Sequence, residues 1–150
     1  MVLNLKLYVE MIAKLLTVEQ QVHSQSTRRI LLIEDNDVNR MLLSDYLRYC
    51  RYSVQSLPGA SNFFRTIDKF KPELILLDLK LPDVDGYSLL EQIQQKPDLS
   101  KIPVIVVSAF AFKADQERAM RLGACRYFVK PVNLTNLILA IEEELAGLQL

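Results

Sequence analysis

The chain has 150 residues, half of them hydrophobic and 24% charged, which is the composition of one globular domain rather than a disordered segment. Its 18 basic and 18 acidic side chains balance to a formal net charge of zero, which argues against a nucleic-acid-binding surface. No apolar stretch is long enough to span a bilayer and the N-terminus lacks a secretory pattern, so we expect a cytoplasmic protein without a membrane partner. The two cysteines lie far apart, and we expect them to be buried apolar residues in a reducing compartment.

Near the N-terminus, apolar residues recur at helical spacing. Leu5, Val9, Ile12 and Leu16 predict one helix with an apolar stripe. The residues from 20 to 27 are polar and predict a linker, so we divide the chain into residues 1–27 and a domain of residues 28–150. The stripe could pack on the domain, pair two copies of the chain, end a longer signalling helix or contribute little, and the sequence does not choose among these.

From residue 28 onward, strand and helix patterns alternate. Short apolar runs predict five strands, at Ile30–Ile33, Ser53–Leu57, Leu74–Leu77, Val104–Val107 and Tyr127–Val129. A helix is predicted after each strand: the first capped by Asn36 or Asp37, the second from Ala60 to Phe70, the third opened by Gly86, the fourth over Lys113–Leu122 and the fifth capped by Asn133. This alternation predicts a parallel sheet with helices on both faces, and ligand chemistry gathers beyond the carboxyl ends of such strands.

Polar and charged residues follow these strands. Glu34 and Asp35 follow the first strand, Asp78 the third, Ser108 the fourth and Lys130 the fifth. Three carboxylates at one sheet edge would repel each other by roughly 4 kcal/mol per pair at an effective dielectric near 20, and one lysine offsets only part of this. A hard divalent cation is the natural remedy, and Mg²⁺ prefers carboxylates, phosphate and water as ligands.

With a metal bound, the Asp78 carboxylate is a plausible nucleophile toward phosphorus. Transfer of a phosphoryl group depends mainly on positioning and on neutralising charge. The Lys130 ammonium can neutralise charge, and the Ser108 hydroxyl can donate a hydrogen bond to a phosphoryl oxygen.

Several short motifs carry these residues: Ile33-Glu34-Asp35-Asn36, Leu77-Asp78-Leu79-Lys80-Leu81-Pro82 with Asp85-Gly86, Ser108-Ala109, and Tyr127 three residues before Lys130-Pro131. With these motifs the chain resembles the receiver domains of two-component response regulators over about residues 28 to 146. The segment from Ser108 to Asp115 is most similar to stand-alone receivers that control cell polarity and division. The Glu34-Asp35-Asn36 triplet with Asn39 is also frequent in receivers of hybrid kinases and phosphorelays.

This resemblance implies a fold and a set of roles. The fold would be flavodoxin-like, a doubly wound five-stranded parallel sheet in the order 2-1-3-4-5 with five surrounding helices, plus the extra N-terminal helix. Asp78 would accept the phosphoryl group and Lys130 would contact it. The resemblance further implies these roles: Mg²⁺ binding by Glu34, Asp35, Asp78 and the Lys80 backbone carbonyl, switching by Ser108 and Tyr127, and a cis bond before Pro131. The chain departs from the commonest family pattern at two positions, since Glu34 replaces an aspartate and Ser108 replaces a threonine.

The implied function is signalling by protein–protein interaction. A sensor histidine kinase or a histidine phosphotransfer protein would supply the phosphoryl group. A downstream protein would bind the face formed by the Lys113–Leu122 helix, the last strand and the last helix, with Tyr127 turning inward on phosphorylation. Exposed Phe110 and Phe112 would strengthen the case for a partner surface just after Ser108.

The alternatives belong to other classes. The chain could be the detached receiver of a hybrid kinase or phosphorelay, or an unphosphorylated scaffold that forms a homodimer through its N-terminal helix. A Mg²⁺-dependent phosphohydrolase would place an acid two residues after its nucleophile, and that residue here is Lys80, which cannot protonate a leaving group in that way. We therefore expect the chain to catalyse only its own phosphorylation and dephosphorylation.

Overall fold

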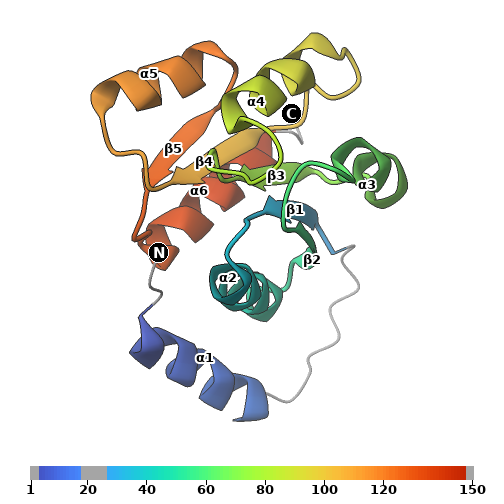
Figure 1. The fold of residues 1–150 in the computed structure, drawn as a ribbon. Coiled ribbons are helices and arrows are strands. Elements are labelled where there is room, and N and C mark those ends of the chain that lie inside the picture. The colour runs from blue at the N-terminus through green and yellow to red at the C-terminus, as the bar shows by residue number, and fades with distance from the viewer. Residues whose placement is uncertain (1–3, 18–26, 148–150) are drawn as a thin grey trace.

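A computed structural model describes residues 4–17 and 27–147 and shows strands and helices alternating along the chain (Figure 1). The helices are α1 (Leu5–Thr17), α2 (Asp37–Tyr49), α3 (Phe63–Phe70), α4 (Gly86–Gln95), α5 (Lys113–Arg121) and α6 (Leu134–Gly147). The strands are β1 (Arg29–Ile33), β2 (Ser53–Leu57), β3 (Leu74–Leu77), β4 (Val104–Ser108) and β5 (Arg126–Val129).

The five strands form one parallel sheet in the order β2-β1-β3-β4-β5. Strand order reverses beside β1, because β2 pairs on one side of it and β3 on the other. Ile33 at the end of β1 is in register with Leu77 at the end of β3, so the residues that follow these two strands are neighbours. The predicted flavodoxin-like sheet is confirmed.

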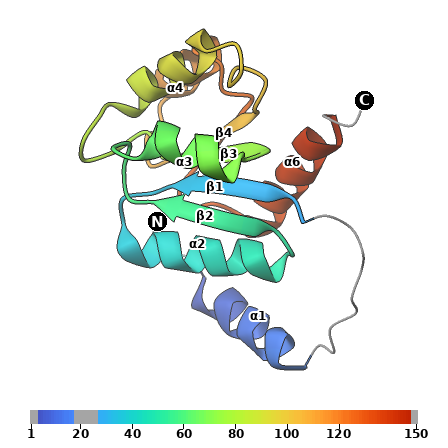
Figure 2. The same cartoon turned by 90° about the vertical axis from the view of Figure 1, so that its right-hand side faces the viewer.

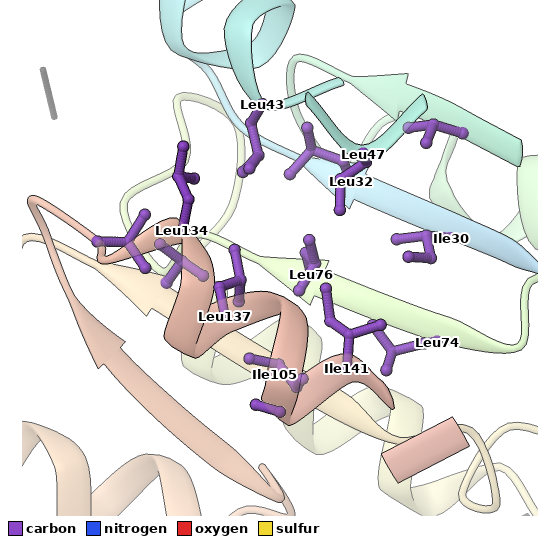
Figure 3. Packing of buried hydrophobic residues seen from close by; sticks show 14 of the residues in the cluster. Ile30, Leu32, Leu43, Leu47, Leu74, Leu76, Ile105, Leu134, Leu137 and Ile141 are labelled. Atoms are coloured by element: carbon purple, nitrogen blue, oxygen red, sulfur yellow. The ribbon is translucent and has the colours of Figure 1, made fainter. Parts of the chain in front are cut away.

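Helices cover both faces of the sheet (Figure 1). On one face, leucine and isoleucine side chains of α2 and α6 pack on β1, β3 and β4 (Figure 3). The labelled members of this cluster are Ile30, Leu32, Leu43, Leu47, Leu74, Leu76, Ile105, Leu134, Leu137 and Ile141. Because β1, β3 and β4 are buried on both faces, they are apolar at nearly every position instead of alternating.

The opposite face is covered by α3, α4 and α5. Phe63 and Ile67 of α3 and Leu90 and Ile93 of α4 are buried there against β1, β3 and β4. The alternation of short strands and amphipathic helices therefore produces two separate cores, one on each side of the sheet.

Helix α1 lies outside this three-layer body, along α2 (Figure 2). Among the side chains of residues 5–13 in this helix, Met11 is buried, and the Tyr8 hydroxyl donates to Asp45 Oδ2 on α2 at 3.2 Å. The apolar stripe indicated by the spacing is not the buried face of α1, since Leu5 is 73% and Val9 58% exposed. The side chain of Leu16 and residues 20–26 of the predicted linker lie outside the described residues.

The predicted helix ends agree closely with the structure. Asn36 caps α2 by accepting from Asn39 N at 2.9 Å, Asp85 caps α4, and Asn133 accepts from Asn136 N at 3.0 Å. Helix α3 begins at Phe63, three residues after the predicted Ala60, and a turn in which the Phe63 N–H donates to Ala60 O at 3.0 Å precedes it. The predicted cis bond between Lys130 and Pro131 is present.

Two bulk features complete the comparison with the sequence. Cys50 and Cys125 are free thiols that are half-buried rather than fully buried, and burial raises the pKa of Cys125 to about 11. None of the helices within residues 4–17 and 27–147 has the length and apolar character that a membrane-spanning segment needs.

Candidate functional site

The parallel sheet brings the predicted charged residues to one edge. Glu34 follows β1, Asp78 follows β3 and Lys130 follows β5, and the side chains of all three are nearly buried. Ser108 ends β4 and is fully buried, whereas Asp35 is exposed at the mouth of the site. The Asp78 N–H donates to Ile33 O at 3.0 Å, which extends the ladder between β1 and β3 into the site.

One ammonium group joins two of the carboxylates. Lys130 Nζ lies 2.7 Å from Asp78 Oδ2, and 3.0 and 3.1 Å from the two Glu34 carboxylate oxygens. The backbone supports this contact, because Lys130 N donates to Ser108 O at 2.9 Å and Lys80 N donates to Asp78 Oδ1 at 3.1 Å. Such charge-assisted bonds hold the carboxylate oxygens in fixed positions.

Electrostatics at this site are unbalanced. Burial, and next the neighbouring Asp78 carboxylate, raise the pKa of Glu34 to about 7 against the opposing effect of Lys130. Burial alone would lower the pKa of Lys130, but the bonds and charges of Asp78 and Glu34 outweigh it and raise that pKa. Lys130 therefore stays charged at neutral pH, while Glu34 is poised between its two protonation states.

The acidic residues fit a hard divalent cation. Glu34, Asp35 and Asp78 each offer one carboxylate oxygen, and these three oxygens lie within 4.8 Å of one another. An all-oxygen donor set with one exposed member suits an ion that keeps several waters. The arrangement thus supports the prediction of an acidic pocket able to hold a metal.

The loop after Asp78 is closely packed. Lys80 forms an antiparallel bridge with Asp85, and the Gly86 N–H donates to Leu79 O at 3.1 Å. A Cβ at Gly86 would come within 2.4 Å of Leu79 Cα, so only glycine allows this approach. The Lys80 side chain is exposed, so it does not form a buried proton donor beside Asp78.

Ser108 and Tyr127, the predicted switch pair, meet at Phe110. The Phe110 N–H donates to Ser108 Oγ at 3.1 Å, and the Tyr127 hydroxyl donates to Phe110 O at 2.7 Å. Tyr127 is half-buried against the core and burial raises its pKa, so its hydroxyl remains a donor at neutral pH. The two phenylalanines after Ser108 differ, since Phe112 is 79% exposed whereas Phe110 is half-buried.

Two residues near the pocket were not among those that the sequence indicated. Arg40 donates to Glu34 O at 2.8 Å and to Asp37 Oδ1 at 2.6 Å, so it braces the loop that carries the acidic pair. Asp83 accepts from Ala60 N at 2.9 and 3.1 Å and ties the loop after β3 to the loop after β2. The i,i+3 spacing of Asp37 and Arg40 on α2 is a signal for the first contact, but no local pattern indicates the second.

Fold and site together define a class of protein. The chain belongs to the response regulator receiver domain family, whose model matches residues 30–142, and the resemblance drawn from the motifs is confirmed. It is therefore a receiver of two-component signalling.

Particular relatives narrow the comparison. The chain is 31% identical over 119 residues to the polar-differentiation response regulator DivK of Brucella ovis, covering 79% of this chain and 97% of that protein. A CheY-like receiver domain protein from Methanospirillum hungatei superimposes with a TM-score of 0.72 at 29% identity, over 81% of this chain and 96% of that one. The receiver domain of a signal transduction histidine kinase from Syntrophus aciditrophicus has a TM-score of 0.74 at 27% identity, over 81% and 92% of the two chains. The similarity to stand-alone receivers that the sequence indicated is thus confirmed, and α1 lies outside the family match.

Proposed function

We propose that Asp78 accepts a phosphoryl group from a phosphohistidine of a sensor kinase or phosphotransfer protein. The observation that carries this proposal is a buried aspartate, 5% exposed, with an ammonium 2.7 Å away and two further carboxylates beside it. An Asp78 oxygen would attack phosphorus as the phosphorus–nitrogen bond breaks, and the imidazole would leave with the bonding electron pair. The product is an acyl phosphate on Asp78.

Each neighbouring residue has a role in this proposal. Glu34, Asp35, Asp78 and the Lys80 carbonyl would hold Mg²⁺, which when bound supplies neutralisation of the phosphoryl charge. The Lys130 ammonium, which now contacts Asp78 Oδ2, would contact a phosphoryl oxygen once Asp78 is phosphorylated. The Ser108 hydroxyl would donate a hydrogen bond to a second phosphoryl oxygen.

Intact mass spectrometry tests the acceptor. Incubation with acetyl phosphate and Mg²⁺ should add one phosphate, about 80 Da. Asp78→Asn should abolish the addition, whereas Asp98→Asn, which removes an exposed acid from a distant loop, should not. Phosphate addition that persists in Asp78→Asn would overturn the proposal.

We further propose that the signal is read by another protein on the face formed by α5, β5 and α6. Tyr127 supports this role, because its hydroxyl contacts the loop that leads from Ser108 to α5. The tyrosine is already turned toward the core, so phosphorylation would stabilise this arrangement rather than create it. Amide NMR shifts on these elements should change with beryllium fluoride, a phosphoryl mimic, and the change should shrink in Ser108→Ala.

We infer that the chain acts in the cytoplasm and is not an enzyme for external substrates. The exposed Lys80 at the position of the missing acid supports the second inference. Release of inorganic phosphate from common phosphate esters at many turnovers per chain would overturn it.

Two arrangements of α1 bear on partners. Exposed Leu5 and Val9 on α1 support a homodimer through this helix. The likeness to a histidine kinase receiver domain supports the alternative of a detached phosphorelay receiver. Light scattering on the chain with and without residues 1–27 tests the homodimer, because truncation should then reduce the mass in solution to about half.

A further inference from the structure

Phe110 is held on both sides of its backbone by the predicted switch pair. Its N–H donates to Ser108 Oγ at 3.1 Å and its carbonyl accepts from the Tyr127 hydroxyl at 2.7 Å. Since Ser108 Oγ accepts one hydrogen bond from Phe110, the proton of the serine hydroxyl is directed elsewhere. The position of the Phe110 backbone therefore limits the directions in which Ser108 can donate.

The side chain of Phe110 is anchored on another element. Its ring stacks on the buried Tyr87 of α4, with ring centroids 6.5 Å apart and an interplanar angle of 9°. The Tyr87 hydroxyl lies 3.4 Å from both Asp115 O and Asp115 Oδ1 on α5, and the Arg118 guanidinium lies 4.0 Å from the Tyr87 ring centroid. Burial raises the pKa of Tyr87 to about 12, so this hydroxyl is a donor.

These contacts end at the molecular surface. Tyr87 and Arg118 help to line a groove of about 320 Å³ between α4 and α5. The other residues of the groove are Asp85, Ser88, Glu91, Arg121 and Leu122. An unbroken series of contacts thus runs from the Ser108 hydroxyl, through Phe110 and Tyr87, to an open groove away from the pocket.

We propose that Phe110 is a positioning residue: by stacking on Tyr87 it orients the Ser108 hydroxyl for a phosphoryl group on Asp78 and couples the pocket to the groove between α4 and α5. This inference rests on the proposed phosphoryl acceptance by Asp78. Loss of the stack frees the Phe110 backbone, so Ser108 samples other rotamers and donates less often to the phosphoryl group. Residues that merely pack the loop would affect stability without changing the affinity for a phosphoryl mimic.

Calorimetric titration with beryllium fluoride in the presence of Mg²⁺ tests the first part. Phe110→Leu, which keeps apolar bulk but removes the stacked ring, should weaken binding about two- to tenfold, the effect of weakening the one hydrogen bond from Ser108 to the mimic. Phe110→Tyr should restore the affinity. Phe112→Leu is the matched control, because this phenylalanine is two residues away, 79% exposed and outside the stack, and it should bind as the unmodified chain does.

Amide NMR tests the coupling. Saturation with the mimic should shift the resonances of Ser88 and Leu122 in the groove of the unmodified chain. Those shifts should disappear in Phe110→Leu and in Tyr87→Leu, while the shifts around Asp78 persist. The double variant should lose no more of the groove shifts than either single variant does, because both substitutions remove the same contact.

The two levels of the proposal fail differently. If the unmodified chain does not bind the mimic, the phosphoryl acceptor and the role of Phe110 are both overturned. If it binds, and Phe110→Leu has the same affinity and the same groove shifts, only the role of Phe110 is overturned.

Discussion

Lys130 Nζ lies 3.0 Å from Oε1 and 3.1 Å from Oε2 of Glu34, so one ammonium bonds both oxygens of a carboxyl group that is only 2% exposed. The same ammonium also serves Asp78 at 2.7 Å. One positive charge shared between two buried carboxyl groups leaves the pocket short of positive charge. We make three predictions for this pocket and the loop beside it.

The first concerns pH. Because the pKa of Glu34 is raised from 4.5 to about 7, the folded chain holds a proton there that the unfolded chain has released. In EDTA, the free energy of unfolding should therefore fall as pH rises from 4.5 to about 7, by about 3 kcal/mol at most. Glu34→Gln should flatten this slope, and urea denaturation at a series of pH values measures it. An unchanged slope in Glu34→Gln would contradict the assignment.

The second concerns metal affinity. Lys130→Met removes the cation that competes with a metal for Glu34 and Asp78, so Mg²⁺ affinity should rise about tenfold or more, given interactions of a few kcal/mol at an effective dielectric near 20. The affinity for beryllium fluoride should fall in the same variant, because the mimic loses its contact with the Lys130 ammonium. Calorimetry with Mg²⁺ measures the first effect. Lys101→Met, at an exposed lysine before β4, is the control and should leave both affinities unchanged.

The third concerns the loop after Asp78. In Gly86→Ala the new methyl group would lie 2.4 Å from Leu79 Cα and 2.5 Å from Leu79 O, both backbone atoms that cannot rotate away. We expect a loss of about 2–3 kcal/mol in unfolding free energy and weaker Mg²⁺ binding, because the Leu79–Lys80 backbone must shift. Gly147→Ala adds the same group where nothing lies within 4 Å and should be neutral or slightly stabilising. Equal stabilities of the two variants in chemical denaturation would refute this reading.

A fourth prediction concerns α1. Met11 is 2% exposed, so Met11→Ala should weaken the docking of α1 on α2 by about 1–3 kcal/mol. Hydrogen exchange should show loss of amide protection in α1 while β1 and β3 keep theirs. Met120→Ala on α5, where the methionine is 45% exposed and away from α1, is the matched control and should change neither.

The fold and the position of the pocket could be predicted because both follow from topology. Alternating strand and helix patterns specify a parallel sheet, and a parallel sheet brings the residues after its strands to one edge. Glu34, Asp78 and Lys130 lie at one edge for that reason, although they are far apart in the chain, and the long Lys130 side chain reaches past β4 to both acids.

Other contacts could not be predicted because they depend on the packing of distant segments. Apolar residues occur on more than one side of α1, and the side that faces the domain is the one with Met11 and with Tyr8, which bonds Asp45 on α2. The stack of Phe110 on Tyr87 joins the loop after β4 to helix α4, two segments that no sequence period relates. Phe110 is half-buried, so only Phe112 gives the support for a partner surface after Ser108 that exposure of both phenylalanines would have given.

The pairing of Ile33 with Leu77 has a consequence for the evolution of such a chain. A slip of one residue between β1 and β3 would turn either Glu34 or Asp78 to the opposite side of the sheet. Substitutions among the buried aliphatic residues that shift this register can therefore abolish phosphoryl acceptance, while every polar residue of the pocket stays unchanged. Inactive descendants of this protein need not show a single altered acid or lysine.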